Sequence, residues 1–234
     1  MMTDSVPVAC ERRGGIVDKI HRGSLALVDG EGRILAAVGD PAKVVFLRSA
    51  AKPLQALALI ERGGADRYGL TAGEIAILCA SHSGGPDELA AVRSILAKAG
   101  VPEESLRAGS GLGDCCSGKH AGMLALAEML GLPREGYALA RHPVQEILLA
   151  VVSEMCGLAA CQIGLAIDGY GAPTYALPLR HLALGYARLA NPQALPPPRA
   201  EACRTIIAAM HAHPELVGGL DWGRLTRGKT VAKT

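Results

Sequence analysis

The sequence predicts an α+β fold, because short strand-like segments come first and a series of helical segments follows. Apolar runs separated by turn residues occupy residues 15–39, and one more short apolar run spans residues 44–47. Helix start and stop signals then recur from residue 49 to residue 211. Residues 230–234 have the pattern of the start of a strand. We therefore expect a sheet with an unpaired edge, to which a further strand could add.

The first predicted element is a β-hairpin over residues 15–39. Apolar runs at residues 16–17 and 25–28 lead into the sequence Asp-Gly-Glu-Gly at residues 29–32, which is typical of a tight turn. The apolar run at residues 34–38 then returns along the first strand.

The first predicted helix begins at Ser49, whose side chain is a favourable N-cap. Pro53 falls in the first turn, where a missing N–H is tolerated, and the apolar stripe continues to Ile60. Gly63 and Gly64 end the pattern.

Six further helices are predicted from their start and stop signals. Thr71 and Glu74 have the spacing of a capping box at the start of one of them. Residues 191–198 contain four prolines, which predict a surface connection and not a domain boundary, so we expect a single domain over residues 1–234. The predicted helices span residues 71–79, 86–98, 117–130, 143–155, 177–189 and 199–211.

The composition fits a globular protein and excludes two classes of partner. Half of the 234 residues are hydrophobic, which is enough for a sizeable core. The net charge is only +2, no run of Lys and Arg is longer than Arg12-Arg13, and aromatic residues make up 3%. These features exclude a nucleic-acid interface, and the absence of a run of about 18 apolar residues excludes an ordinary membrane span.

The seven cysteines are an odd number and are scattered along the chain. The N-terminal segment lacks the apolar core of a signal peptide, so we expect a cytoplasmic protein whose cysteines are reduced thiols. Most of them are expected to be buried and to pack as small hydrophobic residues.

Ser49 and Lys52 form a Ser-x-x-Lys sequence, which places the two side chains about one helical turn apart on the same face. An amine in a partly desolvated pocket loses its preference for the proton and can act as the base for a Ser hydroxyl. Ser-x-x-Lys is the nucleophile motif of the penicillin-recognising enzymes. Because so short a motif also arises by chance, it predicts a catalytic pair only together with further residues.

Two loops offer residues that could join this pair. The segment from Ser81 to Gly84 is either a helix C-cap with Gly84 in the left-handed region or the source of a second active-site hydroxyl at Ser81. Asp168 follows the apolar run 163–167, where it either begins an Asp-Gly turn or holds an ammonium group.

Cys116, Lys119 and His120 lie within one turn at the start of a predicted helix. A cysteine there is expected to have a lowered pKa, because the helix N-terminus favours the thiolate. The adjacent pair of Cys115 and Cys116 does not have the spacing of a zinc knuckle. Residues 109–113 are glycine-rich but lack the Gly-Lys-Ser/Thr of a phosphate loop, so we expect no nucleotide site.

Four segments together resemble the Rhizobium-type asparaginase II family, the thermolabile bacterial asparaginases that are unrelated to the common bacterial type II enzymes. The run Cys-Ser-Gly-Lys-His-Ala-Gly that begins at Cys116 is far more specific than Ser-x-x-Lys. The segments occur in the family's order, and the resemblance extends over nearly the whole chain. They are residues 48–55, 79–82, 116–124 and 168–173.

The resemblance implies a fold similar to the serine β-lactamases and penicillin-binding proteins, with an antiparallel sheet and helices. It also implies hydrolysis of L-asparagine to L-aspartate and ammonia, and it assigns roles by position. Which serine is the nucleophile stays open, as does the preference between asparagine and glutamine. The implied catalytic residues are Ser49, Lys52, Ser81 and Lys233, the substrate-binding residues are Arg48, His120 and Asp168, and the zinc ligands are Cys116 and Lys119.

The chain departs from the family pattern in two places. Tyr170 stands where the family has its second zinc-binding cysteine, so we expect zinc to bind weakly and not to be required, unless Cys115 takes that place. The sequence around Lys233 matches the start of the family's Lys-Thr-Gly-Ala-Glu-Gly segment but stops before its Gly and Glu. We therefore expect a domain truncated before its closing strands, with an open edge that favours pairing with another chain, and a homodimer.

Three functions remain in competition. The first is an asparaginase-type amidohydrolase that uses Ser–Lys nucleophilic catalysis on asparagine. The second is a penicillin-recognising serine hydrolase, which also needs a Ser-Asp-Asn element that this sequence lacks. The third is a truncated paralogue whose catalysis is impaired.

Overall fold

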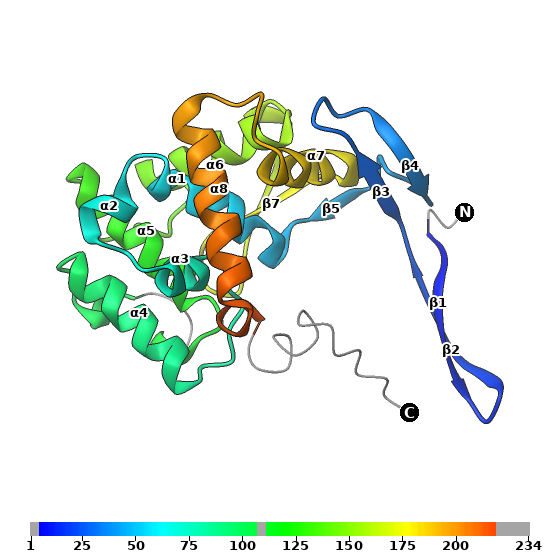
Figure 1. Cartoon of the computed structure of the whole chain (residues 1–234), viewed down its shortest axis with the longest axis horizontal. Helices are drawn as coiled ribbons and strands as arrows, with labels where there is room; N and C mark the ends of the chain where they lie inside the picture. The colour runs from blue at the N-terminus through cyan, green and yellow to red at the C-terminus, as the bar shows by residue number, and fades with distance from the viewer. Residues whose placement is uncertain (1–4, 107–110, 219–234) are drawn as a thin grey trace.

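The structure is a computed structural model that describes residues 5–106 and 111–218. It contains helices packed into one body and short antiparallel sheets beside it (Figure 1). The predicted α+β class is confirmed. The predicted strand at residues 230–234 lies outside the described residues.

The N-terminal strands form two hairpins where one was predicted. β3 (Leu25–Val28) pairs with β4 (Ile34–Val38) across the predicted turn, which is confirmed. The residues at 16–17 belong instead to β2 (Ile16–Gly23), which pairs with β1 (Val6–Arg13). Gly14 and Gly15 connect β1 to β2 with φ values of 54° and 83°, a conformation that favours glycine and permits a tight turn.

The third sheet has the order β5-β7-β6, with β7 in the centre. Its strands are β5 (Val44–Phe46), β6 (Gly164–Ile167) and β7 (Pro173–Pro178), and both pairings are antiparallel. Leu177 was expected to begin a helix, but it pairs with Val45 in this sheet and is fully buried. The following helix, α7 (Leu179–Ala190), therefore starts two residues later than predicted.

The remaining helices agree closely with the predicted ones. Thr71 forms the predicted capping box: its Oγ1 accepts from the Glu74 backbone N–H at 3.3 Å, and a Glu74 carboxylate oxygen accepts from the Thr71 N–H at 2.6 Å. The short helix α2 (Gly64–Tyr68) was not predicted. The others are α1 (Lys52–Ile60), α3 (Ala72–Leu78), α4 (Pro86–Lys98), α5 (Ser117–Leu130), α6 (Pro143–Cys156) and α8 (Pro197–Ala212).

The start of α1 differs from the prediction in one respect that matters for function. Residues Arg48–Ala51 form a turn of 3-10 helix, and α1 itself begins at Lys52. The N-cap of α1 is Ala51 and not Ser49, so the N-cap prediction is wrong. The Ser49 hydroxyl group instead accepts a hydrogen bond from Ser81, a residue that lies far along the chain.

Helix α1 lies at the centre of the helical body and is buried along its whole length. It contacts α5, α6 and α8, which surround it (Figure 1). A helix that is enclosed on every side is expected to be apolar all round, so its polar members need an explanation. Lys52 and Gln55 are these members, and both face the cavity described below.

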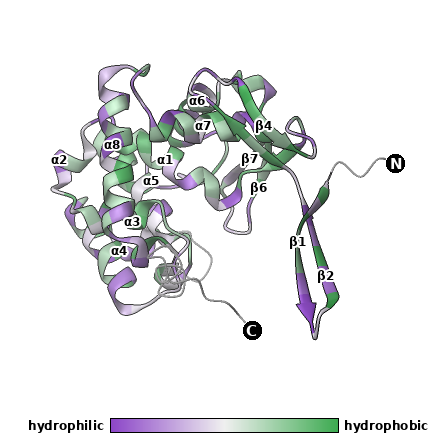
Figure 2. Ribbon diagram, turned by 45° about the vertical axis from the view of Figure 1, so that its right-hand side comes forward, coloured by the Kyte–Doolittle hydropathy of each residue, from purple (hydrophilic) through white to green (hydrophobic). Residues whose placement is uncertain are grey.

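The strands are much less covered than the helices. The hairpin of β1 and β2 projects away from the helical body (Figures 1 and 2). β4 and β6 carry concentrated hydrophobic colour in Figure 2, and their large side chains are exposed: Ile34, Leu35, Val38, Leu165 and Ile167. In residues 5–106 and 111–218, no helix has both the length and the apolar character that crossing a membrane requires.

Candidate active site

A cavity of about 450 Å³ lies where the helical body meets the β5-β7-β6 sheet. Its helical wall is formed by the residues around the starts of α1 and α5, and its strand wall is formed by β5, β6, β7 and the turn after β6. The cavity thus joins segments that are widely separated in the sequence. The helical wall includes Arg48, Ser49, Lys52, Gln55, Cys115, Cys116 and Lys119, and the strand wall includes Phe46, Ile167, Asp168, Tyr170, Pro173 and Tyr175.

Ser49, Ser81 and Lys52 form a continuous chain of hydrogen bonds at this cavity. The two hydroxyl oxygens lie 2.6 Å apart, and Lys52 Nζ lies 2.9 Å from the Ser81 hydroxyl. Ser49 lines the cavity, while Ser81 connects it to the buried amine. The structure therefore brings together three of the predicted catalytic residues from two loops and a helix start.

The Lys52 side chain is almost completely buried. Its amine also donates to the backbone carbonyl oxygens of Ala80, at 2.5 Å, and Cys115, at 3.2 Å. Burial lowers the pKa of Lys52 from its ordinary value, because the ammonium form loses hydration, and the positive charge of Lys119 acts in the same direction. A neutral amine has the lone pair that a general base needs.

Arg48, immediately before Ser49, has an unusual backbone conformation. Its φ is 49°, the left-handed region that non-glycine residues rarely occupy, and it is the only such residue in the described part of the chain. The neighbouring Leu47 N–H donates to Tyr175 O at 2.9 Å, which fixes this segment to the central strand. Strained backbone of this kind is concentrated at functional sites.

The loop after α3 is held so that Ser81 faces Ser49. The Ser81 N–H donates to Val217 O at 2.9 Å. The His82 ring accepts from the Gly84 N–H on Nδ1 at 3.2 Å, so its Nε2 carries the proton and donates to the Ser117 hydroxyl at 2.9 Å. Gly84 does adopt a positive φ of 79°, but α3 is capped at Cys79, so the C-cap interpretation is wrong.

Asp168 satisfies both interpretations of its position, since it organises a turn and also faces the cavity. One carboxylate oxygen accepts from the N–H groups of Tyr170 and Ala172 at 2.9 and 3.0 Å. The other accepts from Lys119 Nζ at 3.0 Å. Burial alone would raise the pKa of Asp168, but the charge and hydrogen bond of Lys119 outweigh it, and the pKa lies below its usual value.

His120 does not line the cavity, in contrast to the position that the resemblance implies. It is completely buried on the inner face of α5, where its Nδ1 lies 2.8 Å from the Tyr137 hydroxyl group. Its Nε2 has no hydrogen-bond partner among the described residues. Burial lowers the pKa of His120 to about 3, so the ring is neutral at physiological pH.

The residues implied as zinc ligands do not fit a zinc ion in this arrangement. Lys119 is engaged in the ion pair with Asp168. The Tyr170 hydroxyl lies 3.5 Å from Cys115 Sγ, and this contact raises the pKa of the phenol well above its usual value, so the phenolate ligand is disfavoured. Cys116 is buried, which raises the pKa of its thiol despite the nearby lysines; the expectation of a lowered pKa is wrong.

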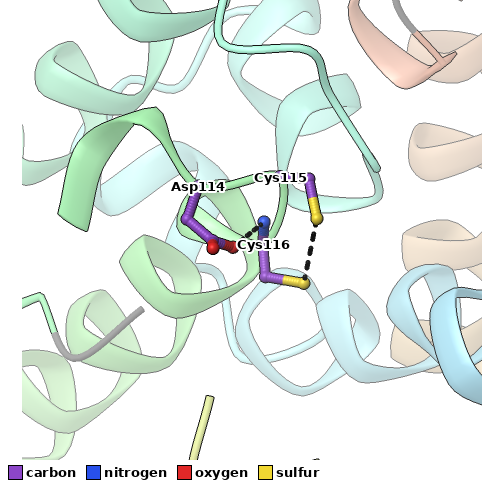
Figure 3. Close-up of side chains that lie close together, drawn as sticks. All are labelled: Asp114, Cys115 and Cys116. Atoms are coloured by element: carbon purple, nitrogen blue, oxygen red, sulfur yellow. Dashed lines mark hydrogen bonds between the residues drawn. The ribbon is translucent and has the colours of Figure 1, made fainter. Parts of the chain in front are cut away.

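Asp114, Cys115 and Cys116 have side-chain ligand atoms within 4.8 Å of one another (Figure 3). The two sulfur atoms lie 3.8 Å apart, but the Asp114 carboxylate accepts the Cys116 backbone N–H at 2.8 Å. That carboxylate therefore already stabilises the turn before α5 through a hydrogen bond.

The sequence prediction included one catalytic residue outside the described part of the chain and missed one residue of the cavity. Lys233 lies outside the described residues. Gln55 was given no role, yet it lines the cavity and its side-chain amide lies 3.5 Å from the Tyr175 hydroxyl group. The signal was present in the sequence, because Ser49, Lys52 and Gln55 repeat at intervals of three residues along one side of a helix start.

Comparisons with known proteins agree with the family resemblance. The model of the L-asparaginase II family matches residues 9–227, which includes every described residue of the cavity. A search of curated proteins found no match. Because the match extends over nearly the whole sequence and includes the Ser49–Ser81–Lys52 cluster, the chain belongs to the L-asparaginase II family.

Proposed function

We propose that this protein hydrolyses the side-chain amide of L-asparagine, releasing L-aspartate and ammonia, with Ser49 as the nucleophile. Membership of the family supports an asparaginase-like amidohydrolase in general. The observation that carries the specific proposal is the hydrogen-bonded chain from Ser49 through Ser81 to the buried Lys52 amine, with distances of 2.6 and 2.9 Å.

The surroundings of Lys52 favour its role as the base. A neutral amine has two N–H groups, and the carbonyl oxygens of Ala80 and Cys115 accept both of them. The lone pair is then directed at the Ser81 hydroxyl, which lies 2.9 Å from Lys52 Nζ and donates to Ser49 at 2.6 Å. The relay requires this hydroxyl to turn its proton toward Lys52, so that it accepts from Ser49 instead. Ser81 acts in this scheme as a proton relay, because it is hydrogen-bonded both to the Lys52 amine and to the Ser49 hydroxyl.

The proposed reaction has two steps. Ser49 Oγ attacks the amide carbon while its proton passes through Ser81 to Lys52. The ammonium group of Lys52 then returns that proton to the amide nitrogen, which leaves as ammonia and yields an aspartyl ester on Ser49. A water molecule attacks the ester with the same base, so that aspartate and the free serine are regenerated.

The charges of the cavity suit an amino-acid substrate. Arg48 lines the cavity beside Ser49, and a guanidinium group is a suitable partner for the substrate α-carboxylate. Asp168 offers a carboxylate for the α-ammonium group, which would share it with Lys119. The serine β-lactamase-like arrangement belongs to the same proposal, supported by a Ser-x-x-Lys sequence that opens a buried helix beside an antiparallel sheet.

Ammonia release by the purified chain tests the proposal. We expect asparagine to be hydrolysed, with Ser49→Ala reducing the rate by at least about 10²-fold. Ser83→Ala is the matched control, because Ser83 is exposed on the same loop as Ser81 but does not line the cavity. Glutamine, tested in parallel, measures the preference between the two amides. Equal rates in the wild type and Ser49→Ala would refute the assignment of Ser49.

A further inference from the structure

Cys115 and Cys116 are two adjacent thiols for which the proposed reaction has no use. Their sulfur atoms lie 3.8 Å apart at the turn before α5 (Figure 3). Both residues line the cavity, and Cys115 is partly exposed. Small oxidants that enter the cavity therefore reach Cys115 first and find a second thiol beside it.

We propose that Cys115 and Cys116 are an oxidation site that closes to a disulfide between adjacent residues. The oxidant is a small disulfide such as oxidised glutathione. The Cys115 thiolate attacks it, forms a mixed disulfide and releases one glutathione thiol; the Cys116 thiolate then displaces the second. Two electrons and two protons leave the protein, and one disulfide is reduced to two thiols.

The other five cysteines lack this arrangement. Cys79, Cys156 and Cys203 are buried and do not line the cavity. Cys10 and Cys161 are exposed, but they lie on β1 and on the turn that precedes β6. Reaction at those two positions serves as the comparison for the adjacent pair.

A disulfide between adjacent residues should be easy to reduce. Consecutive Cα atoms are about 3.8 Å apart, whereas disulfides usually join Cα atoms about 4.4–6.8 Å apart, so ring closure introduces strain. Strain makes a disulfide more reducible, and such bonds are the labile ones. The site is therefore suited to reversible oxidation and not to permanent cross-linking.

Closure of the disulfide ring would also change a hydrogen bond of Lys52, the base of the proposed reaction. The peptide between the two cysteines must rotate, and this peptide carries the Cys115 carbonyl oxygen that accepts from Lys52 Nζ at 3.2 Å. Its N–H, from Cys116, is the group bound by Asp114 at 2.8 Å. Oxidation thus removes one of the two carbonyl oxygens that orient the Lys52 lone pair.

The oxidation site can be tested by mass spectrometry, independently of any enzyme activity. Trypsin cleaves after Arg107 and Lys119, so Cys115 and Cys116 share the peptide 108–119, which contains no other cysteine. The protein is made in a Cys10→Ser, Cys161→Ser background, exposed to oxidised glutathione, alkylated and digested. We expect the peptide to be lighter by two hydrogen atoms and to escape alkylation at both positions.

Two results would overturn the proposal. One is a peptide that remains fully alkylated, and the other is a stable glutathione adduct on Cys115. Cys116→Ser provides the reference for the second result, because Cys115 alone can only form the mixed disulfide.

The effect on activity rests on the proposed function and has its own readout. We expect oxidation to lower amide hydrolysis by about tenfold or more, since general-base catalysis contributes about 10²–10⁴-fold, and dithiothreitol to restore it. A disulfide that forms without any change in activity would overturn the connection to Lys52. If the protein hydrolyses no amide, the proposed function fails while the mass measurement still decides the oxidation site.

Discussion

The starts of α1 and α5 on one side of the cavity are more deeply buried than the outer strands β5 and β6 on the other. On the helical wall, Lys52 is 2% exposed and Cys116 is 7% exposed, and their polar atoms have defined partners. On the outer strands of the strand wall, Phe46 in β5 is 53% exposed and Ile167 in β6 is 59% exposed, whereas Tyr175 in the central strand β7 is 1% exposed. Proton transfer needs a desolvated amine at fixed distances, which a buried helix provides. The strand wall includes Asp168 and Tyr170, and in the proposed reaction Asp168 is the partner of the substrate α-ammonium group.

Replacing the buried lysine should have the largest effect. Lys52→Met removes the proposed base and leaves an apolar side chain of similar length, so we expect amide hydrolysis to fall by at least about 10²-fold. The matched control is Lys19→Met, on the hairpin that projects from the body, which should keep the wild-type rate. Initial rates of ammonia release at saturating asparagine measure both. A Lys52→Met enzyme with unchanged turnover would remove the distinction between the two walls.

A pair of glycine substitutions compares the packing of the two walls. A Cβ at Gly118, in α5, would lie 2.1 Å from the Ile77 carbonyl oxygen, whereas a Cβ at Gly169 meets nothing within 4 Å. Overpacking typically costs about 1–3 kcal/mol. Gly118→Ala should therefore lower the free energy of unfolding by at least about 1 kcal/mol. Gly169→Ala should change it by less than about 0.5 kcal/mol. Urea unfolding measures both, and equal losses would contradict the comparison.

His120, which is buried behind the helical wall, should make stability depend on pH. The pKa of His120 is lowered to about 3 in the folded state, against 6.5 ordinarily, so between these values the unfolded chain binds more protons. Its stabilising contribution is complete above pH 6.5 and is lost as the pH falls, by about 1.4 kcal/mol per pH unit. His120→Asn should remove this slope between pH 6 and 4 in urea unfolding. An unchanged slope would contradict the buried, neutral state.

The smallest expected effect concerns the metal. Tyr170→Cys would supply a thiol beside Cys115 and Cys116, where the wild type offers a phenol with a raised pKa. We expect zinc occupancy after dialysis to increase relative to the wild type, with Tyr170→Phe as the control that keeps the ring without a ligand atom. Stoichiometric zinc in the unchanged protein would show that other residues hold the ion.

The helices could be predicted because their signals are local. The capping box at Thr71 and the glycine stops at residues 131 and 157 act within one turn of the helix ends that they define. The hairpin of β1 and β2 was missed although Gly14-Gly15 is a turn signal, because charged residues interrupt the apolar alternation of both strands.

The errors arose where a distant residue decides the local structure. Ser49 is not an N-cap because its hydroxyl group binds Ser81, and Leu177 is in a strand because it pairs with Val45. Both partners are distant in the sequence, so local propensity gives no information about them. For the site, Ser49, Lys52 and Ser81 could be predicted from the sequence. The burial of His120 behind the cavity could not, because it depends on the packing of α5 against Tyr137.

The most direct test of the Ser49–Ser81–Lys52 scheme is the covalent intermediate. Trypsin separates the two serines into peptides 49–62 and 68–93, since it does not cleave between Lys52 and Pro53. Rapid acid quenching during turnover of asparagine, followed by mass spectrometry, should find peptide 49–62 heavier by one aspartyl group and peptide 68–93 unmodified. An aspartyl group on peptide 68–93, or turnover with no acylated peptide at all, would contradict the account.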